Sequence, residues 1–281
     1  MNELTWTPVQ EQRLRELGLN LREITGVFSN VSQRNKLFQQ LEKGQVKKEK
    51  RRLITFLRKG GRVTLENLVE NLTNVLCDKG FVRVTTPIVI SKSSLARMTV
   101  DDEHLLSRQV FWIGENKCLR PMLAPNLYSL MVDFSRFRYR PVRFFEIGSC
   151  FRKESDGAKH NSEFTMLNLV EMGTPEEKRL DRLKDLASLV AVTAGLSDYR
   201  FENEESKVYG TTLDVVTGPE NIEVASGAMG PHPLDTAWGI TDSWVGIGFG
   251  LERLLMTAAG ETSISRWGKN LSYINGIRLS L

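Results

Sequence analysis

Residues 151–172 read FRKESDGAKHNSEFTMLNLVEM, and they carry the plainest structural signal in the chain. Residues 150–154 and 163–171 have the composition of β-strands, and the residues between them are polar, as in a loop. We therefore expect a strand, a loop and a second strand. Arg152 stands at the end of the first strand, and a guanidinium there can bind phosphate oxygens through two parallel hydrogen bonds. The alternative is a surface hairpin that carries an Arg/Glu pair.

A second motif lies far downstream, where residues 246–255 read GIGFGLERLL. The spacing predicts a glycine-rich strand that turns into a helix. Glycines allow the backbone to approach a bound nucleotide closely, and Arg253 falls near the start of the helix. A glycine-rich turn alone is weak evidence. Together with Arg152 upstream, it becomes a strong indication of a phosphate site.

The third motif precedes both. Thr64 is a suitable cap for a helix that ends at Gly80, and apolar residues recur through it at helical spacing. Residues 81–84 and 86–90 then have strand character, with Pro87 at the junction. An ordinary connection from a helix to an edge strand would have the same pattern.

The remaining segments predict an α+β fold. We expect further strands at 109–113, 142–147, 208–216, 222–229 and 243–248, and helices at 124–134 and 174–195. Strands in runs, without regular alternation with helices, favour an antiparallel sheet flanked by helices. Residues 1–61 have a mostly polar, helical pattern and form a separate N-terminal helical region, which leaves 62–281 as one large domain.

Basic residues are concentrated in the N-terminal region, although the net charge of the whole chain is only +4. The segment from Arg34 to Lys59 is rich in Lys and Arg and contains only two acidic residues, Glu42 and Glu49. Such an imbalance suits a polyanionic partner. A solvated helix face is the alternative interpretation.

Composition narrows the class of protein. The chain has 281 residues, 41% of them hydrophobic, and no apolar run approaches the roughly 18 to 20 residues that span a bilayer. We expect a cytoplasmic protein without a leader segment. Its three cysteines and three histidines are too scattered for a zinc site, so the cysteines are expected to be reduced and buried, and any metal to be held by oxygen.

The three motifs, in this order and on these predicted elements, resemble the three signatures of the class II aminoacyl-tRNA synthetases. The resemblance is most specific to pyrrolysyl-tRNA synthetases of the short type, which lack a separate N-terminal tRNA-binding domain, and it covers residues from about 62 to 281. The stretches that carry it are 119–128 (LRPMLAPNLY), 152–157 (RKESDG), 163–168 (EFTMLN), 209–214 and 248–255 (GFGLERLL).

The resemblance implies a class II catalytic domain over 62–281 that uses ATP and Mg²⁺. Arg152 and Arg253 would be the catalytic residues, Glu223 and Ser226 the magnesium ligands, and the first motif a homodimer interface. The implied ATP-binding set is Arg152, Glu154, His160, Phe164, Glu223, Ser226, Gly248 and Arg253. Ile247 departs from the small residue that is commoner in the family, which leaves the floor of the adenine pocket open.

The same resemblance implies a deep chamber for a lysine-derived side chain. Its residues would be Ala124, Leu127, Tyr128, Met131, Asn168, Val170, Tyr209 and Trp244. Asn168 would bind the side-chain amide carbonyl, Tyr209 would reach the distal ring, and Arg120 would help to hold the backbone carboxylate. Ordinary core packing would also account for several of these apolar residues.

The implied activity is the ATP-dependent ligation of pyrrolysine to its amber-suppressor tRNA through an aminoacyl adenylate. The basic helices of residues 1–61 would contact the tRNA, with Lys47, Lys48, Arg51 and Arg52 as the tRNA-binding residues. Two alternatives remain open at this point. One is a class II synthetase for phenylalanine or phosphoserine, and the other is a catalytically silent paralogue that binds tRNA.

Overall fold

The computed structural model describes residues 4–20, 24, 26–137, 139–153, 161–206, 209–261 and 263–279. The chain divides into two compact units. The first comprises Met1–Val63 together with Asn270–Leu281, and the second is Thr64–Lys269. The boundary near residue 63 lies close to the predicted one. Residues 270–281, which we expected in the catalytic domain, are grouped with the N-terminal helices instead.

The first unit is built on two helices, α1 (Pro8–Glu16) and α2 (Val31–Lys59). Thr7 and Gln10 form a capping box at the start of α1, and the Asn30 side chain caps α2. Gly60 follows α2 with a positive φ of 64°, which ends the helix. The short hairpin of β10 (Tyr273–Ile274) and β11 (Ile277–Arg278) completes the unit.

Two glutamates attach the C-terminal hairpin to these helices. Glu49 of α2 is only 1% exposed, and its carboxylate accepts from Arg52 at 2.6 Å and from the backbone N–H of Arg278 at 3.3 Å. The Arg278 guanidinium pairs with Glu16 of α1 at 2.7 Å. These contacts explain why residues 270–281 belong to the first unit, since a charge buried this deeply requires partners.

A seven-stranded sheet forms the centre of the second unit, with strand order β1-β4-β5-β9-β8-β7-β6. All neighbouring strands are antiparallel except β1 and β4, which are parallel. The strands are β1 (Val82–Arg83), β4 (Val142–Phe151), β5 (Glu163–Met172), β6 (Arg200–Ser206), β7 (Gly210–Thr217), β8 (Ile222–Gly230) and β9 (Trp244–Gly250). The predicted α+β class is confirmed.

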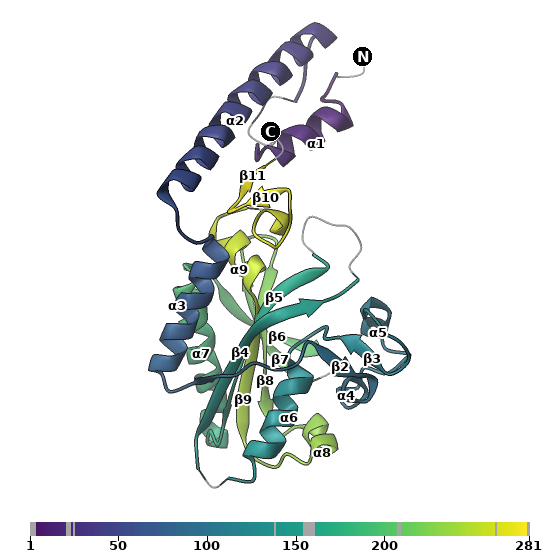
Figure 1. The fold of residues 1–281 in the computed structure, drawn as a ribbon, viewed down its shortest axis with the longest axis vertical. Coiled ribbons are helices and arrows are strands. Elements are labelled where there is room, and N and C mark those ends of the chain that lie inside the picture. Colours follow the sequence, from purple (N-terminus) through teal and green to yellow (C-terminus); the bar gives the residue numbers. More distant parts are fainter. Residues whose placement is uncertain are drawn as a thin grey trace. The chain divides into compact units, whose positions relative to one another are not determined.

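Helices cover the sheet on both sides. In Figure 1, α3 and α7 lie together on one side, and α6 and α8 lie together on the other. The helices of this unit are α3 (Thr64–Asp78), α4 (Lys92–Ala96), α5 (Leu105–Gln109), α6 (Ala124–Phe134), α7 (Arg179–Thr193), α8 (Pro233–Trp238) and α9 (Leu251–Ala258). A small sheet of β2 (Val89–Ser91) and β3 (Lys117–Leu119) lies outside the main one.

Two expectations about local structure were wrong, and one strand, β6, was missed. The strand expected at 109–113 is absent, because Leu105–Gln109 forms α5 and Trp112 makes only an isolated bridge with Cys118. The strands expected at 142–147 and 150–154 form one strand, β4. The sequence of β6 is mostly charged and polar, as suits an edge strand, and so gave no apolar signal.

The cysteines are free, but they are not all buried. Cys118 and Cys150 are fully buried, and burial raises the pKa of their thiols to about 11 and about 12 respectively. Cys77, near the end of α3, is exposed, whereas we expected it to be buried. Leu68, Leu72 and Leu76 form the buried stripe of that helix, and Cys77 lies outside it.

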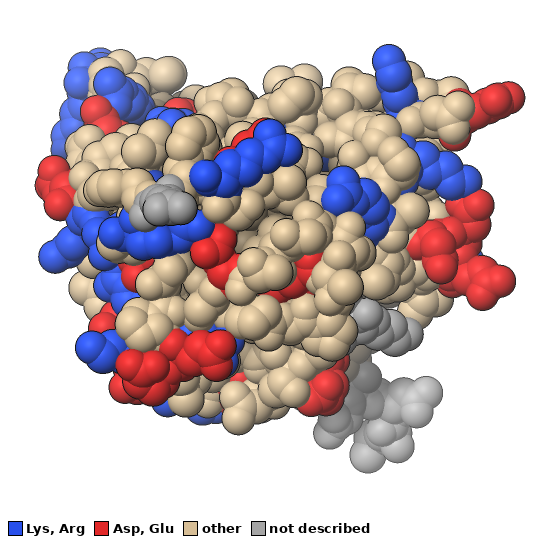
Figure 2. Space-filling model, turned by 90° about the horizontal axis from the view of Figure 1, so that it is seen from below, with Lys and Arg blue, Asp and Glu red and all other residues tan. Residues whose placement is uncertain are grey.

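Two surface properties bear on possible partners. In the described part of the chain, no helix is both long and apolar enough to cross a membrane. Figure 2 shows a face on which Lys and Arg side chains are interspersed with Asp and Glu. The basic excess of the chain is therefore not gathered into one patch on that face.

Candidate active site

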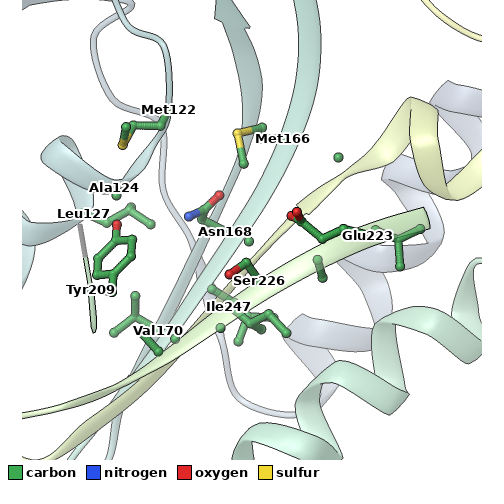
Figure 3. Close-up of a pocket in the computed structure, with 18 of the residues that line it drawn as sticks. Met122, Ala124, Leu127, Met166, Asn168, Val170, Tyr209, Glu223, Ser226 and Ile247 are labelled. Carbon is green, nitrogen blue, oxygen red and sulfur yellow. The ribbon is translucent and has the colours of Figure 1, made fainter. Parts of the chain in front are cut away.

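A cavity of about 300 Å³ opens in the second unit, between α6 and the strands β5, β8 and β9 (Figure 3). It brings together residues that lie up to about half the chain apart in sequence. Among its lining residues are Ala124, Leu127, Tyr128, Met131, Arg152, Phe164, Asn168, Val170, Tyr209, Glu223, Ser226, Trp244, Ile247, Gly248 and Arg253. Apart from Arg120, every described residue that we expected at the nucleotide and the amino-acid sites lines this cavity.

Arg152 lies at one end of the cavity, immediately after β4. Its Nε donates to the backbone oxygen of Pro121 at 3.0 Å, and its guanidinium lies 5.2 Å from the centre of the Phe164 ring. Both contacts restrict the direction in which the guanidinium points. The Phe164 ring also lines the cavity, so it is placed to stack on a planar ligand.

Arg253 reaches the same end from α9. Its Nη1 donates to the backbone oxygen of Glu223 on β8 at 2.8 Å. The Glu223 carboxyl responds electrostatically to both Arg253 and Arg152, each of which lowers its pKa. Arg152 and Arg253 thus line the same cavity, although they are separated by about a hundred residues of sequence.

Glu223 and Ser226 provide oxygen atoms beside these arginines. Both lie on β8 and line the cavity, and Asp214 on β7 is the cross-strand partner of Ser226. Burial and the nearby Asp214 raise the pKa of Glu223 above its ordinary value, and the two arginines only partly oppose this. The carboxyl of Glu223 and the hydroxyl of Ser226 are the kinds of oxygen ligand that a magnesium ion takes.

Glu252 was not identified from the sequence, although it adjoins Arg253. It is fully buried, and both of its carboxylate oxygens accept from the backbone N–H of Thr165, at 2.8 and 2.9 Å. This contact ties the start of α9 to β5. Burial raises the pKa of Glu252. We interpret Glu252 as a residue that fixes the position of α9 and therefore the backbone position from which the Arg253 side chain extends.

Asn168 lies between the two ends of the cavity, as Figure 3 shows. Its Oδ1 is buried and has no hydrogen-bond partner among the described residues. A Cβ at Gly248, its neighbour on β9, would come within 2.9 Å of that oxygen. Gly248 therefore leaves room for the Asn168 amide. An unpaired buried acceptor costs free energy, and a ligand that donates a hydrogen bond to Oδ1 would remove this cost.

The other end of the cavity is apolar. Ala124, Leu127, Tyr128 and Met131 fall on one face of α6 at helical spacing, and all four side chains are buried. Val170 of β5 and Trp244 of β9 form further parts of the wall. The result is a chamber whose surface is apolar apart from the hydroxyl groups of Tyr128 and Tyr209.

A buried carboxylate stands behind this wall and was missed by sequence reasoning. Asp235 of α8 accepts from the hydroxyl of Tyr128 at 3.0 Å and from the indole Nε1 of Trp244 at 2.9 Å. It also accepts from the backbone N–H of His232 at 2.9 Å, in a capping box. The His-Pro-Leu-Asp pattern of residues 232–235 is a helix-start signal that could have drawn attention to it.

Arg120 does not have the position that we expected. It is absent from the cavity lining and is only 2% exposed, and its Nη1 pairs with Glu146 at 2.7 Å. The same Nη1 also donates to the side chain and the backbone oxygen of Thr86, and Nε donates to the backbone oxygen of Ser149. Arg120 therefore connects β4 with the segment before β2. Glu154 and His160, expected to bind ATP, lie outside the described residues.

The residues expected to bind tRNA lie in the first unit, along one side of α2. Lys47, Lys48, Arg51 and Arg52 line a shallow groove with Lys59, Phe56, Asn275 and Ile277. All four are exposed. Arg52 donates to Glu49, so part of its charge is neutralised within the unit. The groove nevertheless presents a predominantly basic surface.

Comparison with known proteins decides the family. Residues 51–274 match the family model described as the class II core domain of tRNA synthetases (F). The chain belongs to the class II aminoacyl-tRNA synthetases. Members of this class use ATP and Mg²⁺ in general.

Solved structures narrow the assignment. A crystal structure of pyrrolysyl-tRNA synthetase from Desulfitobacterium hafniense is 48% identical, with a TM-score of 0.92, and the match covers 99% of each chain. A second structure from that organism, described as a pyrrolysyl tRNA synthetase, is 47% identical with a TM-score of 0.91 and covers 100% of this chain and 98% of that one. Within class II, the chain belongs with the pyrrolysyl-tRNA synthetases.

Curated relatives outside this group are more distant. A threonine–tRNA ligase from Clostridium perfringens is 31% identical over 190 residues, which are 61% of this chain and 28% of the ligase. A lysine–tRNA ligase from Pelotomaculum thermopropionicum is 30% identical over 145 residues, or 50% of this chain and 26% of the ligase. The chain spans only about a quarter of the length of these curated relatives.

Proposed function

We propose that this protein ligates pyrrolysine to its cognate amber-suppressor tRNA through an aminoacyl adenylate. One observation carries the proposal: a single cavity has a cationic end, formed by Arg152 and Arg253, that continues into an apolar chamber large enough for a long side chain. ATP binds at the first end and the amino acid in the second. The two substrates thereby meet at the centre of the cavity, near Asn168.

The first reaction needs no covalent enzyme nucleophile. A carboxylate oxygen of the amino acid attacks the α-phosphorus of ATP, the bond to the β-phosphate oxygen breaks, and pyrophosphate leaves. Negative charge develops on the phosphate oxygens, and the guanidinium groups of Arg152 and Arg253 stabilise it. The protein also aligns the reactants, which reduces the entropic cost of their reaction.

A magnesium ion fits the oxygen atoms beside the arginines. Mg²⁺ prefers carboxylate, hydroxyl, phosphate and water oxygens, and it takes few protein ligands when a nucleotide provides the others. Glu223 and Ser226, which both lie on β8 and line the cavity, would hold it. The ion would neutralise charge on the phosphates. Among the described residues, no cluster of three His, Cys, Asp or Glu side chains offers a competing metal site.

The apolar chamber suits a lysine derivative with a bulky, uncharged end. Burial in a chamber lined by Leu127, Met131 and Val170 selects a side chain by size and shape. The unpaired polar atom of Asn168 binds an amide group midway along that side chain. Because one methylene changes binding by only roughly 1–3 kcal/mol, we expect the enzyme to accept other bulky lysine carbamates.

The tRNA enters the second reaction, in which its terminal adenosine hydroxyl attacks the adenylate carbonyl and AMP leaves. We assign the backbone contact to the basic groove of α2. Replacing Lys47, Lys48, Arg51 and Arg52 together by Gln should lower tRNA affinity and flatten its salt dependence, since each lost phosphate contact reduces the slope by about one. Filter binding at several salt concentrations measures both. Unchanged affinity and slope would make α2 structural.

Two copies of the chain are proposed to form the active enzyme. Val82, Ile88 and Val89, in the segment where we expected the dimer interface, are 62%, 43% and 45% exposed. Clustered exposed apolar residues of this kind favour association. Sedimentation equilibrium would detect the dimer, and a monomer at micromolar concentration would contradict it.

Amino-acid-dependent pyrophosphate exchange tests the proposed function directly. Pyrrolysine, phenylalanine and phosphoserine are supplied separately with ATP and Mg²⁺, and exchange is expected with pyrrolysine alone. Exchange with phenylalanine or phosphoserine instead would assign that amino acid as the substrate. No exchange with any amino acid, together with intact tRNA binding, would support the catalytically silent alternative.

A further inference from the structure

Asp235 holds two residues of the chamber wall at once. Its Oδ1 accepts from Tyr128, and its Oδ2 accepts from Trp244 and from the backbone N–H of His232. The carboxylate is 1% exposed and is not part of the cavity lining. Tyr128 comes from α6 and Trp244 from β9, so a single side chain joins two walls that belong to different elements.

The hydrogen bonds around Asp235 have a fixed direction. The Nδ1 of His232 accepts from the backbone N–H of Leu234 at 3.2 Å, so the proton of a neutral imidazole lies on Nε2. That Nε2 lies 3.2 Å from the Tyr128 hydroxyl and donates to it, while the hydroxyl donates to Asp235. Burial lowers the pKa of His232 and so keeps the ring neutral. Tyr128 thus has one orientation, set from both sides.

Trp244 is held by shape as well as by this bond. A Cβ at Gly230 would overlap the indole, and a Cβ at Gly246 would come within 3.1 Å of its ring. The indole therefore lies in a narrow space between two glycine backbones. The tyrosine ring contacts it edge-on, with ring centres 5.8 Å apart. Asp235 fixes the position of the ring within that space, because an indole can only donate and needs an acceptor.

No cation offsets this carboxylate within the described residues. No Lys or Arg side chain among them bonds to Asp235, and its one contact with an ionisable nitrogen within ion-pair distance is to His232 Nε2 at 3.8 Å. Its hydrogen-bond partner Tyr128 packs against the rings of both Trp238 and Trp244. A buried carboxylate held only by neutral donors is costly. This carboxylate bonds two residues of the chamber wall, Tyr128 and Trp244, which points to a role in holding that wall.

We propose that Asp235 is a positioning residue for amino-acid selection: by holding Tyr128 and Trp244, it sets the shape of the chamber for a long side chain. The inference rests on the proposed function and adds to it a residue that does not touch the substrate. Loss of Asp235 should widen the chamber and release both aromatic side chains. The nucleotide end, which uses none of these contacts, should not respond.

Asp235→Asn is the appropriate variant because it keeps size and removes one acceptor. The amide has a single oxygen, whereas Tyr128 and Trp244 both need to donate, so one donor loses its partner. In pyrophosphate exchange, the KM for pyrrolysine should rise on the order of tenfold or more, with the KM for ATP changed less than about twofold. The preference for pyrrolysine over a shorter lysine carbamate should fall.

Asp242→Asn is the matched control. Asp242 accepts three bonds from Arg140, at 2.8, 2.9 and 3.3 Å, and lines no part of the cavity. The same chemical change there should leave both KM values and the amino-acid preference unaltered. Thermal unfolding of both variants separates loss of stability from loss of selection.

A double-mutant cycle distinguishes positioning from general weakening. In a Tyr128→Phe background the tyrosine hydroxyl is gone, so the amide oxygen of Asp235→Asn can accept from Trp244 alone. Asp235→Asn should therefore raise the KM for pyrrolysine less in this background than in the wild type. Additive effects would overturn the proposal, as would an unchanged KM for pyrrolysine in Asp235→Asn.

A last measurement does not depend on the substrate. The indole N–H proton of Trp244, assigned with Trp244→Phe, should shift in the NMR spectrum of Asp235→Asn, and an unmoved resonance would contradict the inference. If wild-type protein activates no lysine derivative, the proposed function fails, and this resonance still decides whether Asp235 positions Trp244.

Discussion

The two ends of the cavity use charge in opposite ways. At the nucleotide end, Arg152, Arg253 and Glu223 line the cavity themselves. At the amino-acid end, the charged group is Asp235, which lies behind Tyr128 and Trp244 and touches no ligand space. One end presents its charge to the substrate, and the other uses its charge to hold a neutral wall.

The chemistry of each end explains the difference. A reaction that builds negative charge on phosphate needs cations within contact distance. A chamber that recognises an uncharged side chain must remain apolar at its surface, because an exposed carboxylate would retain water. Removing a charge should therefore affect catalysis at the first end and selection at the second.

The largest effect is expected from Arg152→Ala. Loss of a cation that stabilises the transition state should reduce pyrophosphate exchange by about 10²–10³, because charge on the α-phosphate then lacks a partner. Affinity for tRNA should change little, since the basic groove lies in the other unit. Arg136→Ala, at an exposed arginine paired with Asp133, is the control. Retained exchange in Arg152→Ala would remove it from the catalytic set.

An intermediate effect is expected from Val170→Phe. Val170 is 6% exposed and lies between Phe144 and Gly246 on the neighbouring strands, so a larger ring must occupy the chamber. The kcat/KM for pyrrolysine should fall about tenfold or more, with ATP binding retained. Val192→Phe, at a position that is 66% exposed, controls for the substitution itself. Unchanged kinetics would place Val170 outside the chamber.

The smallest effect is expected from Glu223→Gln. The folded protein raises the pKa of Glu223, so its ionised form costs stability, and this cost grows as pH rises from 4.5 through the raised pKa. Without nucleotide or metal, the Tm of the variant should exceed that of wild type by up to about 2 °C at pH 8, and the two Tm values should be equal at pH 4. The difference is small because solvent screens a partly exposed carboxyl.

The same pair of proteins tests the metal. Addition of Mg²⁺ and ATP should raise the Tm of wild type at pH 8 more than that of Glu223→Gln, because only the carboxylate can bind the cation. Glu177→Gln, at an exposed position on the surface, should behave as wild type. An equal gain in all three proteins would exclude Glu223 as a ligand.

Local patterns were enough to predict much of the nucleotide end. The strand that leads to Arg152 and the glycine-rich turn before Arg253 each lie in one short stretch of sequence with a recognisable pattern. The face of α6 that carries Leu127, Tyr128 and Met131 was also predictable, because helical spacing alone gathers those side chains. Their roles in binding stay predictions.

Long-range pairing decided the rest. Arg120 was expected at the substrate because it lies within residues 119–128, which carry the family resemblance, yet it forms a buried ion pair with Glu146 on β4. Asp235 had the local appearance of a helix cap, and only the approach of α6 and β9 makes it the acceptor for Tyr128 and Trp244. Sequence alone determined the class of the fold and the groups able to bind phosphate, because both follow from short-range patterns. The tertiary structure decided which charged side chains line the cavity and which are buried and bonded to other residues, because that depends on partners supplied by distant segments.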